Sequence, residues 1–227
     1  MEFALVFRDA GPLLFRGLGI TLETTLFALI FACILGLVTC LFAVSRWRVL
    51  RVLAKIYVGI IRGTPLMVQV FFIYFGLPQF VQSLGIDFRF TAFSAGIITL
   101  SLNAGAYIAE IFRGGILAID PGQMEASRSL GLSYGRSMYR VVLPQALRVS
   151  IPSLVNQFII SLKDTSIISV ISLADICYEA KIYIGTTMQS FTTWTIVGLF
   201  YLVIIFILSQ ISGYIEKRLS YADKSPH

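Results

Sequence analysis

The chain has 227 residues, of which 57% are hydrophobic and only 13% are charged, and its formal net charge is +6. Its apolar runs are longer than a soluble core requires, which excludes an ordinary globular domain, and the length leaves no room for a second, soluble domain beside a helical bundle. We therefore expect an all-α, polytopic membrane protein in which residues 1–227 form a single transmembrane domain.

The hydrophobic pattern predicts five membrane-spanning helices, because a helix crosses the hydrocarbon core with about 20 apolar residues. The predicted spans are residues 18–44, 65–84, 90–112, 150–173 and 194–215. A shorter apolar stretch at 52–61 precedes the second span and is separated from it by Arg62-Gly63-Thr64-Pro65. Proline is favoured in the first turn of a helix and Thr64 can cap it, so we expect the helix to restart or kink there.

Polar side chains inside these spans are candidates for a pathway, because buried polar groups are costly in a membrane. In the third span Asn103, Tyr107 and Glu110 recur at helical spacing and share one face. Glu110 has a second reading as a salt bridge at the membrane end with Arg113, three residues later, and the sequence leaves both open. Gln69 either lines the same pathway or makes a polar contact between helices.

Lysine and arginine are distributed unequally between the two sides of the predicted spans. Thirteen fall on one side and four on the other, and Lys163, inside a span, completes the total of 18. The positive-inside rule therefore predicts an N-terminus outside the cell and a C-terminus in the cytoplasm. The positive net charge thus follows from topology and needs no nucleic acid to explain it.

The segment between the third and fourth spans, residues 120–144, is polar and basic and is predicted to be cytoplasmic. Asp120 followed by Pro121 is a helix start signal, and Gly131 supplies the left-handed residue that ends a short first helix. Ser133 can cap a second short helix that ends near residue 141, before Pro144 disturbs the backbone. Such a segment either forms an interface with another protein or rests on lipid headgroups.

The spacing within this segment resembles that of permease subunits of ATP-binding-cassette importers. Their pattern is E-A-A, three residues, G, nine residues, I, one residue, and L-P. Here it is present with serine for the second alanine and valine for isoleucine, at Glu125, Ala126, Ser127, Gly131, Val141, Leu143 and Pro144. Further stretches resemble the polar-amino-acid branch, especially its glutamine-type permeases, namely residues 62–65, 103–111, 113–114, 143–146 and 163–166.

The resemblance implies partners and a mechanism. The short cytoplasmic helices would be the coupling helix that sits in a groove of a separate ATPase subunit, and this ATPase would bind ATP and Mg. The chain would pair with an identical or homologous permease and receive an amino acid, glutamine first, from an external binding protein. It would lie in the bacterial cell membrane and work by alternating access.

The fourth span carries Lys163 and Asp164 in adjacent positions, followed by Thr165 and Ser166. Neighbours at i and i+1 do not face each other on a helix, so each charge needs a partner elsewhere. One reading is that the two residues contact the ammonium and carboxylate of a zwitterionic amino acid. The other is that they bind neighbouring helices or the second permease.

No motif for catalysis by this chain is present. A phosphate loop of the type G-x-x-x-x-G-K-[ST] is missing, so any ATPase must be a separate chain, and we expect no catalytic residue, metal site or bound cofactor here. The alternative to an ATP-driven importer is a subunit of an ATP-independent secondary transporter or channel, against which only the coupling-helix pattern argues.

Overall fold

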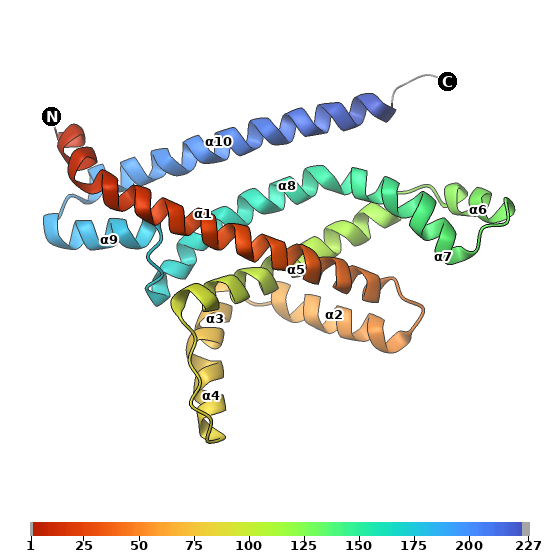
Figure 1. The fold of residues 1–227 in the computed structure, drawn as a ribbon, viewed down its shortest axis with the longest axis horizontal. Helices are drawn as coiled ribbons and strands as arrows, with labels where there is room; N and C mark the ends of the chain where they lie inside the picture. The colour runs from red at the N-terminus through yellow and green to blue at the C-terminus, as the bar shows by residue number, and fades with distance from the viewer. Residues whose placement is uncertain (1, 224–227) are drawn as a thin grey trace.

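The structure, a computed structural model, describes the backbone of residues 2–223 and the side chains of residues 3–214. All regular elements of this part of the chain are helical (Figure 1). They are α1 (Glu2–Ala43), α2 (Arg48–Arg62), α3 (Leu66–Phe71), α4 (Leu77–Ser83), α5 (Ala92–Leu117), α6 (Pro121–Ser129), α7 (Tyr134–Ser137), α8 (Leu143–Ile168), α9 (Ile176–Thr187) and α10 (Ser190–Asp223). Two π-helical turns, η1 (Phe72–Gly76) and η2 (Met138–Val142), and one 3-10 turn, η3 (Ser169–Ile171), continue α3, α7 and α8.

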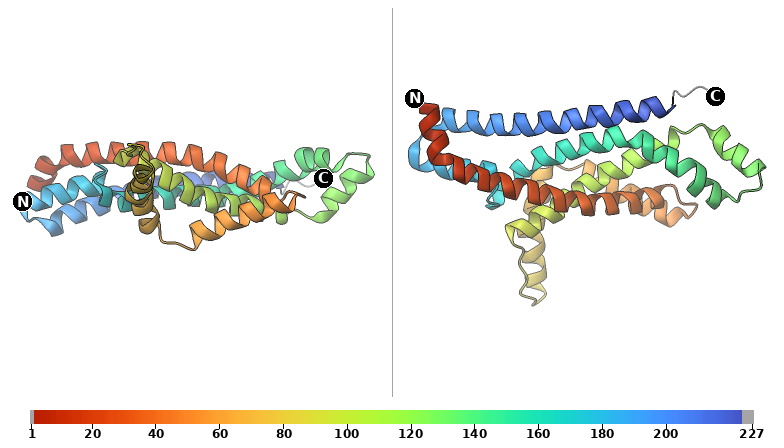
Figure 2. Two further views of the ribbon diagram at one scale, coloured as in Figure 1. Left: turned by 90° about the horizontal axis from the view of Figure 1, so that it is seen from below. Right: turned by 45° about the horizontal axis from the view of Figure 1, so that its top comes forward.

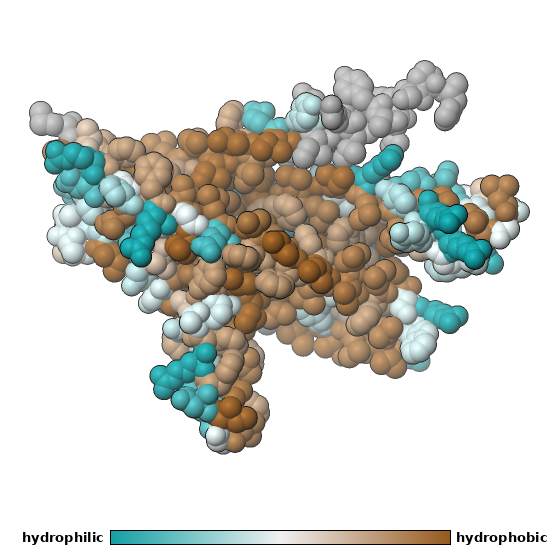
Figure 3. Space-filling model, in the orientation of Figure 1, coloured by the Kyte–Doolittle hydropathy of each residue, from teal (hydrophilic) through white to brown (hydrophobic). Residues whose placement is uncertain are grey.

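Five helical segments of the described chain are long and apolar enough to cross a membrane. They are Phe3–Ala43, Leu66–Ser83, Ala92–Leu117, Tyr134–Ile171 and Ser190–Tyr214, and each overlaps one predicted span. Hydrophobic side chains dominate the surface of the middle of the molecule, and hydrophilic ones gather toward its ends and at the tip beyond α4 (Figure 3). The all-α fold with five spans is therefore confirmed.

The centre of the molecule is the packing of α1 on α5, which run parallel to each other, and of α5 on α8, which run antiparallel. Small residues bring α1 and α5 together: a Cβ added at Gly36 would lie 2.6 Å from the side chain of Ile108. Ala32, Ala104 and Ile108 are all buried at this contact. Close approach through small residues is the usual way in which membrane helices pack, because lipid is as apolar as the side chains themselves.

Two helix boundaries differ from the predicted ones. α1 begins at Glu2 rather than near residue 18 and contains Pro12 within it. The predicted second short helix does not end before the fourth span, because α7, η2 and α8 follow one another without a break from Tyr134 to Ile168. Pro144 is accommodated near the start of α8, where its missing N–H costs little.

The helix α9 was not predicted. It packs on the N-terminal half of α1 and places Ile176, Cys177 and Ala180 in a buried cluster. Asp175 caps it by accepting a hydrogen bond of 2.8 Å from the N–H of Tyr178. Its 12 residues are too few to cross a bilayer. It lies at the end of the molecule opposite α6 and α7 (Figure 1).

The segment α3–η1–α4 projects from the bundle as an arm. Figures 1 and 2 show it running at a steep angle to α1, away from the remaining helices. Phe72 and Phe80 on this arm are 64% and 63% exposed. The second predicted span thus exists as a helix, but it does not run alongside the others.

Candidate functional site

The break between α2 and α3 is held by Gln69. Proline has no N–H, so Pro65 cannot bond to the carbonyl of Ile61, one turn earlier. The amide nitrogen of Gln69 takes its place and donates to the Ile61 carbonyl at 2.8 Å, and also to the carbonyl and hydroxyl oxygens of Thr64. Thr64 itself does not cap α3, whose first flanking residue is Pro65.

Gln69 also ties the break to the third span. Its amide oxygen accepts a hydrogen bond of 3.0 Å from the side-chain nitrogen of Asn103 on α5, and both residues are buried. The structure therefore brings these two predicted residues together in a contact between helices. A role of either in contacting substrate stays a prediction.

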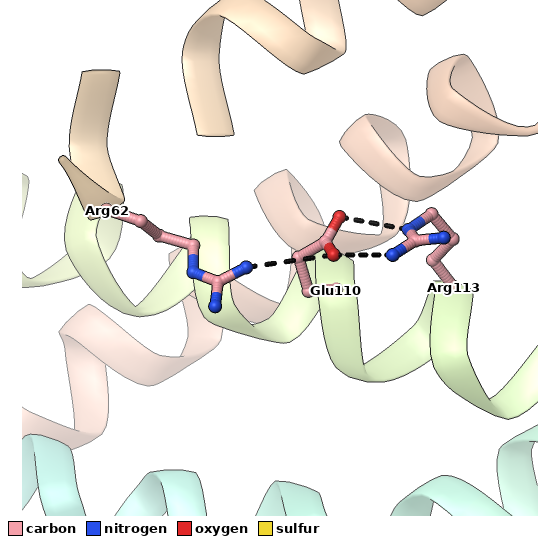
Figure 4. A network of polar contacts seen from close by, with 3 residues as sticks. All are labelled: Arg62, Glu110 and Arg113. Carbon is pink, nitrogen blue, oxygen red and sulfur yellow. Dashed lines mark hydrogen bonds and ion pairs between the residues drawn. The ribbon is translucent and has the colours of Figure 1, made fainter. Parts of the chain in front are cut away.

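Glu110 forms an ionic network with two arginines (Figure 4). Arg113, on the same helix, donates two hydrogen bonds to it, at 3.0 and 2.7 Å. Arg62, at the end of α2, reaches the same carboxylate at 3.7 Å and lies over the ring of Tyr107, 5.2 Å from its centroid. The salt bridge with Arg113 is confirmed, and Arg62 is a third member that the sequence analysis missed.

These side chains border a polar groove of about 530 Å³ between α2, α5 and α8. Of its lining residues, only Tyr107 and Glu110 were predicted to belong to a pathway. The complete lining is Arg62, Tyr107, Glu110, Ile111, Pro152, Ser153, Asn156 and Gln157. The recurrence of polar residues at 153, 156 and 157 in the fourth span, three and four positions apart, was the available signal for the missing side of the groove.

Lys163 and Asp164 lie farther along α8, away from the groove. Seven residues separate Gln157 from Asp164, which is roughly 10 Å along a helix. Lys163 is exposed and Asp164 half-buried, and in the described part of the chain neither forms an ion pair within 4.0 Å. The described side chains therefore supply neither charge with an ion-pair partner.

The neighbouring hydroxyls bond to their own helix. Thr165 is fully buried and donates to the carbonyl of Leu162 at 2.7 Å, and Ser166 donates to that of Lys163 at 2.7 Å. A hydroxyl that donates to the main chain keeps acceptor capacity. The hydroxyl oxygen of Ser166 therefore remains available as an acceptor, whereas Thr165 is buried and its side chain also bonds to Tyr201.

The predicted coupling segment forms an exposed hairpin of α6 and α7 at one end of the molecule (Figure 1). Asp120 caps α6 as predicted, accepting from the N–H of Gly122 at 2.7 Å, and Gly131 has the predicted left-handed backbone with φ of +87°. Ser133 is the residue before α7 but makes no side-chain cap. Large side chains are exposed on this hairpin, with Leu130 at 85% and Tyr139 at 74%, among exposed arginines such as Arg128.

The motif residues fall on both sides of this hairpin. Glu125 and Ala126 are exposed on α6, whereas Ser127 is buried and donates to the carbonyl of Met124 at 2.9 Å. Leu143 is half-buried and Pro144 exposed at the start of α8. The outer face of α6 and the turn at Gly131 are thus free for another protein, while Ser127 serves the packing of the hairpin itself.

Comparison with known proteins identifies the family. The family described as "Binding-protein-dependent transport system inner membrane component" matches residues 28–221. The chain is 40% identical over 212 residues to the probable amino-acid ABC transporter permease protein PatM of Vibrio harveyi, covering 93% of each chain. It is 39% identical over 210 residues to the glutamine transport system permease protein GlnP of Escherichia coli, covering 92% of this chain and 94% of the relative.

The fold agrees with a solved transporter. The crystal structure of an amino acid ABC transporter with histidines superposes with a TM-score of 0.88 at 38% identity, covering 94% of this chain and 97% of that one. With a polytopic helical fold, an exposed hairpin carrying the coupling pattern and matches over nearly its whole length, the chain belongs to the family of binding-protein-dependent transport inner membrane components, as a permease subunit of an amino-acid ABC transporter.

Proposed function

We propose that this chain forms, with a second permease chain, the translocation pathway for a polar amino acid, with glutamine as the first candidate. The polar groove between α2, α5 and α8 carries this proposal, because it places charged and amide side chains inside helices that are otherwise apolar. Relatives of similar identity are named for glutamine, arginine and L-cystine, which supports an amino acid as the substrate.

Charged residues lie at two depths of the proposed pathway, and both sets suit a zwitterionic substrate. Asp164, with no ion-pair partner within 4.0 Å among the described side chains, would receive the ammonium group of the substrate. The ammonium of Lys163 would meet the carboxylate of the substrate. The hydroxyl oxygen of Ser166, whose proton goes to the main chain, would accept from the substrate ammonium, and Thr165 would support the helix behind them. Farther inward, Tyr107 and the network of Arg62 and Glu110 would line the route, with Asn103 and Gln69 fixing the helices behind it.

Energy for transport would come from a separate ATPase that binds ATP and Mg. The exposed turn around Gly131, with Glu125 and Ala126 beside it, would dock in a groove of that subunit in the cytoplasm. This requires the N-terminus and α9 outside and the C-terminus inside. The position of α9 and the N-terminus opposite the α6–α7 hairpin supports this orientation (Figure 1). ATP binding would open the pair outward to accept substrate from a binding protein, and hydrolysis would return it inward.

Uptake into liposomes that contain the complete transporter tests the proposal. Labelled glutamine should enter only with ATP on the ATPase side, and the remaining nineteen amino acids should compete less well. A matched preparation with an inactivated ATPase is the control. Uptake that persists in the control would contradict the importer and favour a secondary transporter or channel. Stronger competition by arginine or cystine would remove glutamine but keep the amino-acid class.

A further inference from the structure

A basic cavity of about 460 Å³ lies between α1, α2 and α5, next to the groove but on its other side. Its volume is in the range of small-ligand sites. Five of its eleven lining residues are small or apolar, and the polar ones are Thr39, Arg51, Lys55, Arg62, Glu110 and Arg113. The feature that needs an explanation is the charge of this lining.

Four cations and one carboxylate give the lining a net charge of +3, counted as four minus one. The carboxylate of Glu110 is already engaged by two hydrogen bonds from Arg113 and by the ion pair with Arg62. Arg51 and Lys55 have no carboxylate within 4.0 Å among the described side chains. Both side chains are exposed, so an anion can reach them, and a cleft lined by charges of one sign concentrates counterions.

The helix α2 separates charge from apolar surface around this cavity. Arg51, Lys55 and Arg62 recur at helical spacing and face the cavity. On the rest of the helix surface five large apolar side chains are at least 46% exposed, namely Val49, Val52, Leu53, Ile56 and Ile60. An occupant with a charged head and apolar tails matches both faces of α2 at once.

The depth of the cavity corresponds to a headgroup region. Its α1 residues, Thr39 and Ala43, come from the last turns of that helix, and Arg51 lies in the first turn of α2. The loop that joins the two helices lies toward the same end of the molecule as α6 and α7 (Figure 1). Basic pockets between membrane helices on the cytoplasmic side are typical sites for anionic lipid headgroups.

We propose that this cavity binds the phosphate headgroup of an anionic phospholipid of the cytoplasmic leaflet, with Arg51 and Lys55 as the principal ligands and the acyl chains along the apolar face of α2. Arg51, a planar donor, would bond two phosphate oxygens, and Lys55 would supply a point charge. The cavity shares Arg62 and Glu110 with the groove, but its principal ligands, Arg51 and Lys55, lie outside the proposed amino-acid pathway. Its occupancy can be measured without transport, so its test does not depend on the proposed function.

Lipid retention by the intact transporter tests the site. The wild type and the double variant Arg51→Gln/Lys55→Gln are purified, incubated with equal amounts of dioleoyl phosphatidylglycerol and dioleoyl phosphatidylcholine, and the bound lipids are counted by native mass spectrometry. Phosphatidylglycerol should be retained by the wild type, with affinity lowered roughly fivefold per cation removed and about thirtyfold in the double variant. The matched control is Arg46→Gln/Arg48→Gln, which removes two exposed cations of the same region that do not line the cavity.

Three results would overturn the proposal. Equal loss in the control variant would show diffuse attraction to the membrane surface, and equal retention of phosphatidylcholine would show that the phosphate charge is not recognised. Displacement of the lipid by inorganic phosphate at similar concentration would assign the cavity to a free anion. If the double variant does not assemble, the single variants are measured. Lys55→Gln alone should still weaken lipid retention, and Arg51→Lys should preserve most of it. Unchanged retention in Lys55→Gln would contradict the proposed site.

Discussion

Gln69 occupies the point where the main chain of α2 and α3 cannot bond to itself. The Pro65 ring removes one N–H, and one side chain replaces it while also accepting a hydrogen bond from Asn103. A single buried amide thus satisfies the broken helix and fixes its position against α5. In a membrane, where no water is at hand to satisfy the Ile61 carbonyl, this arrangement has a direct energetic consequence.

Replacing Gln69 with methionine should destabilise the protein by about 1–3 kcal/mol, because the Ile61 carbonyl and the Asn103 amide lose their partner. A fall of several degrees in the midpoint of thermal unfolding of the purified transporter would show this. Gln79→Met on α4 is the control, since Gln79 is exposed. Equal midpoints for the two variants would contradict the proposed role of the amide.

Asp175 makes stability depend on pH. Burial raises the pKa of this carboxyl from 3.8 to about 6, although the hydrogen bond from the Tyr178 N–H and the charge of Lys181 oppose the shift. Between these two values the folded state binds more protons than the unfolded state, so stability falls as pH rises from about 4 to about 6. The full contribution is present only at the acid end and amounts to about 3 kcal/mol.

Asp175→Asn should remove this dependence, because asparagine keeps the cap and carries no charge. Relative to the wild type, the variant should gain stability steadily from pH 4 to pH 7, as followed by thermal unfolding in detergent. Asp87→Asn, at a side chain that is 88% exposed, is the control and should track the wild type. Parallel curves for the wild type and Asp175→Asn would exclude Asp175 as the source.

At the scale of elements, the turn between α6 and α7 depends on the backbone conformation of one residue, Gly131. Gly131 has φ of +87°, a conformation that costs other residues about 1–2 kcal/mol, yet a Cβ there would meet nothing within 4 Å. Within this chain, the residue type at position 131 is therefore restricted by the backbone conformation and not by neighbouring atoms. Any steric restriction has to come from a docked protein.

Gly131→Asp should reduce both uptake and substrate-stimulated ATP hydrolysis severalfold, because it adds a negative charge to the docking turn. Gly131→Asn is the matched variant: asparagine also tolerates left-handed backbone but adds no charge. It should retain most of the coupling. Unaltered uptake and assembly in Gly131→Asp would refute docking at this turn.

The elements were predictable where a long apolar run or a capping signal specifies them. Asp120 and Gly131 mark the ends of α6 locally, and the five spans follow from length and hydropathy. α9 was missed because 12 residues cannot cross a bilayer, although Asp175 before it was a readable cap. The continuity of α7 with α8 through η2 was missed because Pro144 is tolerated in the first turn of a new helix and only tertiary packing decides whether the chain bends there.

At the scale of the whole molecule, only one side of the groove between α2, α5 and α8 could be predicted from the sequence. The face shared by Tyr107 and Glu110 follows from spacing on one helix, whereas Arg62 and Asn156 join it from α2 and α8. No pattern within a single helix encodes which neighbour packs against it. The contact between Gln69 and Asn103, 34 positions apart, is of the same kind.

The lack of a nearby partner for Asp164 in the described chain gives a prediction for the assembly. Asp164→Asn should lower uptake about 10- to 100-fold per assembled complex, because a charged contact to substrate or to the second permease is lost. Assembly, judged by co-purification of the subunits, should change much less. Asp87→Asn serves as the exposed control, and full uptake in Asp164→Asn would remove this residue from the pathway.

The unbroken path from α7 through η2 into α8 has a mechanical consequence. The helical segment Tyr134–Ile171 contains 38 residues and is therefore about 57 Å long. A straight rod of that length, tilted by about 5° about one end, would move its other end by about 5 Å, the height of a helical turn. The π-helical turn η2 and Pro152 inside α8 interrupt this rod, so force applied beside Gly131 would reach Asp164 reduced by bending at these two points.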